Sequence, residues 1–166
     1  FMFNYTVKET CKSRGIAIND NSTNGSSISE ILEEVGRFWA QPTSNPSAPP
    51  PHCTGAAIDL TLADLSGNQL DLGGEIDFIG DKSMPDFYEK DSLRIPHSKN
   101  QIFHNRRTLL FKVMNKAGFT QHPNEWWHFS YGDQLWSWCS DRENAIYGSA
   151  FDFSKDITFS IPSFVT

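Results

Sequence analysis

Two short segments of the sequence carry the residue types of a hydrolytic metal site. The first runs His52-Cys-Thr-Gly-Ala-Ala-Ile-Asp59, and the second is Glu125-Trp-Trp-His128. Two imidazoles and one carboxylate make a set of three protein ligands, which leaves the fourth position of a tetrahedral zinc ion open for water. The remaining carboxylate can accept the proton of that water. The pattern therefore predicts zinc-assisted hydrolysis.

The two segments together resemble the D-alanyl-D-alanine dipeptidase family. This family belongs to a wider group of zinc D,D- and L,D-peptidases of cell-wall (peptidoglycan) metabolism. The resemblance runs from about Arg37 to about Gly148 and includes the segment Arg37-Phe-Trp-Ala-Gln-Pro42. The motif from His52 to Asp59 is moderately specific, and its combination with Glu-Trp-Trp-His-Phe at this distance is strongly so.

The resemblance implies a role for each site residue. One Zn²⁺ per chain would be held by His52, Asp59 and His128, and Glu125 would be the catalytic base. Asp77, within Gly73-Gly-Glu-Ile-Asp-Phe78, would bind the free ammonium group of a small dipeptide substrate.

One family motif is absent from its expected place. The family carries Tyr-Arg-Pro shortly before the helix that contains Phe38 and Trp39, and its Arg stabilises the developing oxyanion. The matching region, residues 18–26, contains no Arg, Tyr or Pro, and the nearest cations are Arg14 and Arg37. Because one lost oxyanion contact typically costs on the order of 100- to 1000-fold, we expect normal zinc binding and slow hydrolysis. Residues 1–27 are thus a divergent or truncated segment, and residues 28–166 form the dipeptidase-like domain.

Alternatives stay open at this point. A D,D- or L,D-carboxypeptidase acting on cell-wall peptides is the nearest one, and a zinc-binding remnant of low activity is another. His128 could instead be a hydrogen-bonded core residue, and Glu125 or Asp77 an ordinary surface or loop acid. Cys53 could be a fourth ligand, although a closed site would leave no position for water. We expect the remaining histidines, His97, His104 and His122, at the surface or around the ligands.

Composition narrows the class of protein. With 166 residues the chain suits one domain with a sizeable core. A net charge of −6 disfavours binding to nucleic acid phosphates. No apolar run approaches the roughly 20 residues that span a bilayer, and no secretory signal is recognisable. Three cysteines, Cys11, Cys53 and Cys139, cannot all pair. We therefore expect free thiols and a cytoplasmic location, or a periplasmic one if the natural N-terminus is missing.

The expected elements give an α+β fold, with a single domain, a central antiparallel sheet, flanking helices and the zinc site at the sheet. We expect strands at 3–7 and 56–62, a helix capped by Ser29, and a mostly irregular connection over 72–99. A second helix should span 105–117 with Leu109, Leu110, Val113 and Met114 facing inward. Residues 126–131 and 134–138 should form a β-hairpin around Gly132-Asp133.

Strand geometry constrains how the site can assemble. Residues seven apart on one strand face opposite sides, so His52 must lie before the strand that carries Asp59. The prolines at 49–51 and Gly55 allow that bend. Glu125 and His128 are also of opposite parity, which places Glu125 at the irregular start of its strand.

Overall fold

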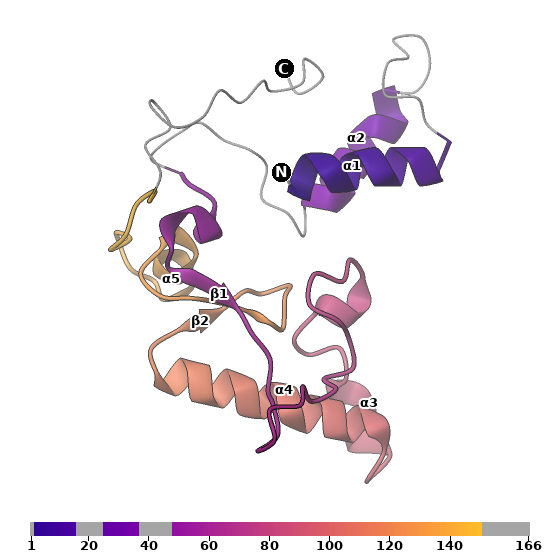
Figure 1. Ribbon diagram of the computed structural model, residues 1–166, viewed down its shortest axis with the longest axis vertical. Coiled ribbons are helices and arrows are strands. Elements are labelled where there is room, and N and C mark those ends of the chain that lie inside the picture. Colours follow the sequence, from indigo (N-terminus) through magenta and orange to yellow (C-terminus); the bar gives the residue numbers. More distant parts are fainter. Residues whose placement is uncertain (1, 16–24, 37–47, 151–166) are drawn as a thin grey trace.

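A computed structural model describes residues 2–15, 25–36 and 48–150 of the chain (Figure 1). It combines helices with a small antiparallel sheet, which confirms the expected α+β class. The α-helices are α1 (Met2–Ser13), α2 (Gly25–Gly36), α3 (Glu89–Arg94), α4 (Lys99–Lys116) and α5 (Gln134–Cys139). The strands are β1 (Ala57–Asp59), β2 (Thr120–Gln121) and β3 (His128–Ser130), and two 3₁₀ helices are η1 (Pro51–Thr54) and η2 (Asp81–Ser83). Among the described residues no helix is long and apolar enough to cross a membrane.

Helices α1 and α2 pack against each other through an apolar cluster of their own. Val7 and Cys11 on α1 meet Ile31 and Val35 on α2, and all four are buried. Both pairs have the i, i+4 spacing that places side chains on one helix face. The predicted strand at 3–7 is therefore wrong, because Val7 belongs to a helical repeat with Cys11.

The start of α2 also differs from the prediction. The helix begins at Gly25, so Ser29 lies inside it rather than at its cap. Phe38 and Trp39, which were expected to extend its apolar face, lie outside the described residues.

The sheet has the order β1-β3-β2, with both pairings antiparallel. In the register of β1 and β3, Ile58 faces Phe129 and Asp59 faces His128. The central strand β3 is buried along its whole length. Beyond the strand ends, the Leu60 amide donates to the Trp127 carbonyl at 3.1 Å, which continues the pairing of the two segments. The short sheet thus joins the two sequence motifs side by side.

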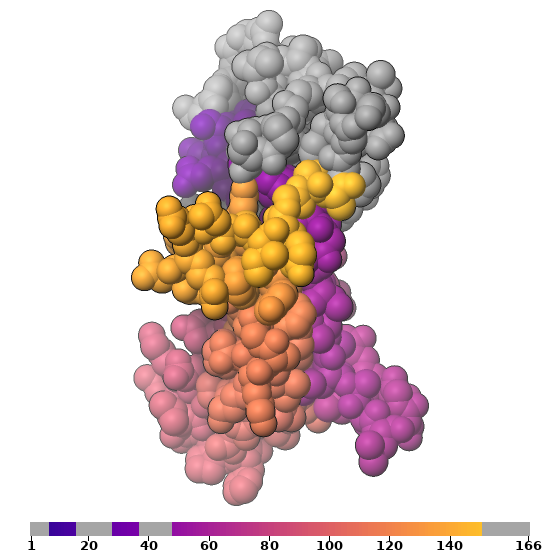
Figure 2. All heavy atoms as spheres, turned by 90° about the vertical axis from the view of Figure 1, so that its left-hand side faces the viewer, coloured from indigo at the N-terminus to yellow at the C-terminus, as the bar shows by residue number. Residues whose placement is uncertain are grey.

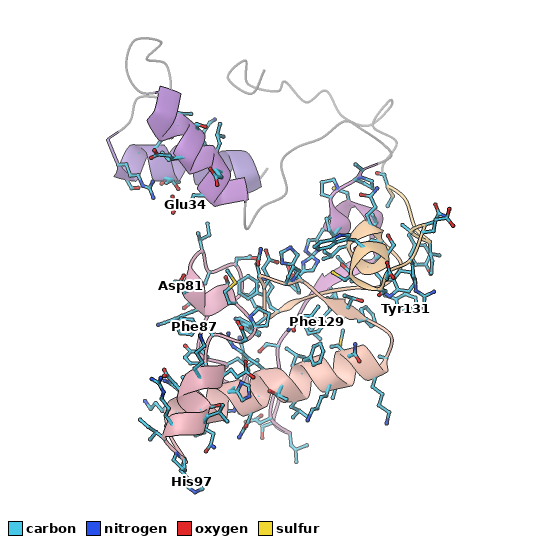
Figure 3. All side chains as sticks on the ribbon, turned by 180° about the vertical axis from the view of Figure 1, so that it is seen from behind. Glu34, Asp81, Phe87, His97, Phe129 and Tyr131 are labelled. Atoms are coloured by element: carbon cyan, nitrogen blue, oxygen red, sulfur yellow. The ribbon has the colours of Figure 1, made fainter. Side chains whose placement is uncertain are left out.

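Helix α4 lies across the sheet (Figures 1 and 3). Its Leu110 joins one buried cluster with Leu72, Trp126, Trp127 and Phe129. Side chains such as these gain about 1.5–3 kcal/mol each when they are fully buried. The tryptophans of the Glu-Trp-Trp-His motif are thus part of the core, and their packing fixes the position of the motif.

The observed α4 corrects the prediction in length and in orientation. Ser98 caps its N-terminus by accepting a hydrogen bond from the Gln101 amide, so the helix starts well before residue 105. Leu110 and Met114 face the core as expected, whereas Leu109 and Val113 are each 54% exposed. The inward stripe instead includes Arg107, which the apolar pattern alone could not indicate.

The predicted hairpin at the end of the domain is wrong. Residues 134–139 form α5, and Asp133 caps this helix by accepting from the Trp136 amide at 2.8 Å. The Gly132-Asp133 pair is therefore the start of a helix. The chain then returns to η1, where the Ala150 amide donates to the Cys53 carbonyl at 2.8 Å. Figure 2 shows this final segment in yellow beside the magenta segment that contains η1.

Candidate metal centre

His52 lies on η1, ahead of the strand that carries Asp59, as its parity requires. Pro51 starts this short helix, and Gly55 ends it with a φ of 71°, in the left-handed region that glycine adopts at little cost. Thr54 fixes the turn, because its hydroxyl donates to the Pro51 carbonyl at 2.6 Å and accepts from the Ala56 amide at 3.0 Å. The turn reverses the chain so that His52 and Asp59 lie on the same side.

Asp59 and His128 meet because they are opposite each other in the β1–β3 register. Glu125 precedes β3 in an irregular turn, in which its amide donates to the His122 carbonyl at 3.4 Å. Its side chain is 7% exposed, and one carboxylate oxygen lies 3.6 Å from Nδ1 of His128. Both parity expectations from the sequence are therefore confirmed.

The three predicted ligand atoms converge on one point. Nε2 of His52 is 3.1 Å from Nδ1 of His128 and 3.2 Å from Oδ2 of Asp59, while His128 Nδ1 is 3.1 Å from Asp59 Oδ1. Ligand atoms bound tetrahedrally at zinc distances of about 2.0–2.1 Å are themselves about 3.3 Å apart. The observed separations are close to that edge length, so one ion fits between the three atoms.

An unpaired polar atom supports the same conclusion. Oδ1 of Asp59 is buried and makes no regular hydrogen bond among the described residues, although it lies 3.1 Å from Nδ1 of His128. Leaving such an atom unsatisfied is costly. A cation at the meeting point of the three side chains would satisfy it. The donor set therefore fits zinc. Among the described residues, these three side chains are the group whose ligand atoms lie close enough together to hold one metal ion.

Ser130 orients the ring of His128. Its buried hydroxyl lies 3.2 Å from Nε2 of His128, on the same strand and two residues further on. When Nε2 donates its proton to this hydroxyl, Nδ1 carries the lone pair that a metal needs. Sequence reasoning missed Ser130, although its i+2 position on a strand places it on the same face as His128.

Electrostatics separate the two acids of the site. Burial, followed by the negative charges of Asp59 and Asp77, raises the pKa of Glu125 to about 8. Burial alone would raise the pKa of Asp59, but the imidazoles of His52 and His128 lower it below its ordinary value. The hydrogen-bonding contact with Asp59 outweighs burial and raises the pKa of His52. One carboxylate is thus held ionised while the other is able to carry a proton near neutral pH.

Asp77 lies near this cluster, on the connection between β1 and α3. It is exposed and has a φ of 65°, in the left-handed region that few non-glycine residues adopt. Its charge raises the pKa of His52 and of Glu125, and partial burial, with the charge of Asp59, raises the pKa of Asp77 itself. The structure thus brings all five predicted site residues into one electrostatic neighbourhood.

The other candidate side chains fall into two groups. The ring of His122 packs on that of His128 with a centroid distance of 5.4 Å, and burial lowers the pKa of His122 to about 4. It is therefore a neutral neighbour of the ligands. His97 is exposed at the N-terminal end of α4, and His104 lies within that helix. Cys53 is a free thiol outside the ligand cluster, as are Cys11 and Cys139.

Sequence comparisons relate this chain to known dipeptidases. A family model described as D-ala-D-ala dipeptidase matches residues 27–149. The D-alanyl-D-alanine dipeptidase of Synechocystis sp. is 46% identical over 110 residues, which are 65% of this chain and 44% of that protein. The Escherichia coli dipeptidase is 37% identical over 78 residues, covering 47% and 36% of the two chains. The Enterococcus faecium dipeptidase is 32% identical over 87 residues, covering 50% and 37%.

The aligned region spans less than half of the length of each of these relatives. The family model, in contrast, covers most of the present chain and includes both motifs and the loop with Asp77. The match begins after the segment in which Tyr-Arg-Pro was expected. On this evidence the chain belongs to the D-alanyl-D-alanine dipeptidase family.

Proposed function

We propose that this protein is a zinc metallopeptidase that hydrolyses the D-alanyl-D-alanine dipeptide. The observation that carries the proposal is the convergence of one ligand atom each from His52, Asp59 and His128, with a buried carboxylate beside them. Membership of the family supports the substrate class, a small dipeptide. The cytoplasmic location expected from the sequence stays a prediction.

The metal chemistry needs three ligands and one open position. A zinc ion bound by these three residues would polarise the scissile carbonyl and lower the pKa of a water molecule in its fourth position. Asp59 provides the charged ligand, and its low pKa keeps it ionised at neutral pH. His52 and His128 would bind the metal as neutral imidazoles, and a hydrogen bond from Nε2 of His128 to the Ser130 hydroxyl would leave the lone pair of Nδ1 for the metal.

Glu125 is the proposed catalytic base. Its carboxylate is close to the ligand His128 and is shielded from solvent. In this position it accepts a proton from the attacking water and later delivers it to the leaving amine. Without a cation the pKa of Glu125 is raised to about 8, and a zinc ion beside it would lower this pKa and so favour the carboxylate, the form that accepts a proton.

Asp77 is the proposed anchor for the substrate's ammonium group. A very small ligand must be recognised at both ends, and a carboxylate is the natural partner for a free amine. Asp77 is exposed, so a ligand can reach it, and its negative charge raises the pKa of His52 and of Glu125. Both observations support a position beside the reacting centre.

The Tyr-Arg-Pro motif that would supply an oxyanion-stabilising arginine is absent from residues 18–26. Of the two nearest cations, Arg14 is on the α1–α2 side of the fold, where its guanidinium pairs with Glu34 at 2.7 Å. Arg37 and residues 18–24 lie outside the described residues. The absence of this motif from residues 18–26 favours the second candidate function, a zinc-binding protein of low activity.

The deciding experiment combines metal analysis with an activity assay on the same preparation. We expect one zinc per chain and slow but measurable release of D-alanine from D-Ala-D-Ala. A tripeptide ending in D-Ala-D-Ala, assayed in parallel, tests the carboxypeptidase alternative. Stoichiometric zinc without hydrolysis of any of these substrates would support the low-activity alternative, and absence of zinc would overturn the metal assignment itself.

A further inference from the structure

Arg107 is a buried cation on α4 that the proposed chemistry does not use. Its side chain is 2% exposed, and among residues 48–150 no carboxylate pairs with it. Burial lowers its pKa only to about 10, so it stays charged at neutral pH. Burying an unpaired charge is expensive unless polar groups surround it. A buried charge of this kind therefore calls for an explanation from its contacts.

The guanidinium binds both ends of one loop. Its Nε donates to the Leu72 carbonyl at 2.8 Å, and its two terminal nitrogens donate to the Met84 carbonyl at 2.8 Å and the Lys82 carbonyl at 2.9 Å. We call the enclosed segment, residues 72–84, the Asp77 loop. Three carbonyls fixed by one planar, forked cation define the ends of the loop in position and orientation.

Aromatic rings complete the clamp. The guanidinium lies 4.9 Å from the ring centroid of Tyr88 and 5.1 Å from that of Trp126. The Tyr88 hydroxyl in turn donates to the Gly73 carbonyl. Gly73 has a φ of 84°, and any side chain there would collide with the Tyr88 and Phe103 rings. The loop is therefore tightly packed at its N-terminal end.

The same cation touches the segment that carries the proposed base. Trp126 follows Glu125 directly, and its amide donates to the Ser83 carbonyl at 2.9 Å. Arg107 thus contacts both the Asp77 loop and the segment that follows Glu125, at the place where the two are hydrogen-bonded to each other. Figure 3 shows this loop, marked by Asp81, beside the sheet and above the N-terminal end of α4, near His97.

We propose that Arg107 is a positioning residue, which holds the Asp77 loop against the Glu125 segment so that Asp77 meets the substrate ammonium. The inference rests on the proposed function, since it assigns to Arg107 the placement of the substrate-binding acid. It acts through carbonyls and rings and touches neither the substrate nor the metal. An apolar side chain at this position could fill the same space, but it could not donate hydrogen bonds to three carbonyls.

The first test needs no substrate. Hydrogen exchange is followed by mass spectrometry in the zinc-loaded protein and in its Arg107→Lys variant. We expect exchange in residues 73–84 to accelerate on the order of tenfold or more, with peptides from β1 and β3 unchanged. Arg106→Lys is the matched control, because among the described residues the neighbouring Arg106 side chain donates to the Asp71 carbonyl alone. Faster exchange across the whole domain would show a general stabilising role and overturn the proposal.

The second test measures ligand binding without turnover, in the Glu125→Gln background. The probes are D-Ala-D-Ala and propionyl-D-alanine, which is the same molecule without its ammonium group. Arg107→Lys should weaken binding of D-Ala-D-Ala on the order of 10- to 100-fold, as expected for a misplaced contact, and leave propionyl-D-alanine unchanged. Adding Asp77→Asn should bring no further loss, because both substitutions remove the same contact.

Other outcomes are equally decisive. Equal weakening of both probes, or additive losses in the double variant, would overturn the proposal. If Arg107→Lys does not fold, Tyr88→Phe removes the hydrogen bond to the Gly73 carbonyl without changing charge. This variant should likewise weaken binding of D-Ala-D-Ala and leave binding of propionyl-D-alanine unchanged. If the parent protein binds neither probe, the proposed substrate is wrong, and localised exchange in the Asp77 loop then decides whether Arg107 holds it.

Discussion

The proposed metal ligands and the proposed substrate-binding acid are held in place by different means. Asp59 and His128 lie opposite each other on paired strands, where backbone hydrogen bonds set their spacing. Asp77 lies in a loop whose ends are held by one side chain, that of Arg107. Backbone pairing survives most side-chain substitutions, whereas a side-chain clamp does not. Zinc binding should therefore tolerate changes that abolish substrate recognition, and the following predictions test this difference.

The largest effect is expected from His52→Ala. Loss of one of three ligands should abolish stoichiometric zinc and, with it, all hydrolysis, since η1 offers no replacement ligand in the cluster. Metal analysis after gel filtration measures the result. His97→Ala, which removes an exposed imidazole far along the chain, is the control and should keep its zinc. Full zinc retention in His52→Ala would remove His52 from the ligand set.

Glu125→Gln should separate metal binding from chemistry. Glutamine keeps the shape of the side chain but cannot accept a proton, so we expect kcat to fall about 1000-fold, while zinc content stays at the parental value. Steady-state assay with D-Ala-D-Ala and metal analysis on the same samples measure both. Activity near that of the parent would exclude Glu125 as the base.

Asp77→Asn should affect recognition more than chemistry or metal binding. A hydrogen bond to a charged group contributes about 1.5–3 kcal/mol, which corresponds to about 10- to 100-fold in KM for the free dipeptide. N-acetyl-D-Ala-D-Ala, which lacks the ammonium group, should be turned over by parent and variant alike. Equal losses on both substrates would show that Asp77 does not bind the ammonium group. The contrast between strand-held ligands and a loop-held substrate contact would then not apply.

Ser130→Ala probes a side-chain hydrogen bond that orients one of the proposed metal ligands. Without the hydroxyl, the ring of His128 loses the partner of its Nε2 atom. Loss of such a partner typically weakens metal affinity about 10-fold. Competition with a zinc chelator measures the affinity, and Ser140→Ala, at an exposed position, serves as the control. A complete loss of zinc would show that the strand pairing alone does not place His128.

The site was easier to predict than the elements that carry it. The ligand types and their parity placed His52 before its strand and Glu125 at the start of the other, because chemistry and the two-residue strand period act locally. The segment at 134–138 was misassigned because Gly132-Asp133 suits a tight turn as well as a helix cap, and only tertiary packing decides between them. The burial of Arg107 could not be predicted, since a charged residue inside a helix gives no sequence signal of burial.

Two of the proposed ligands also lie at the two ends of a long stretch of chain. Asp59 and His128 enclose the Asp77 loop and helices α3 and α4 between them. A shared cation would close this stretch into a ring and act as a cross-link, as a disulfide does, although it would be reversible and sensitive to pH. Supply of zinc would then control how much folded protein a cell accumulates, and a chelator would act on this domain as a denaturant does.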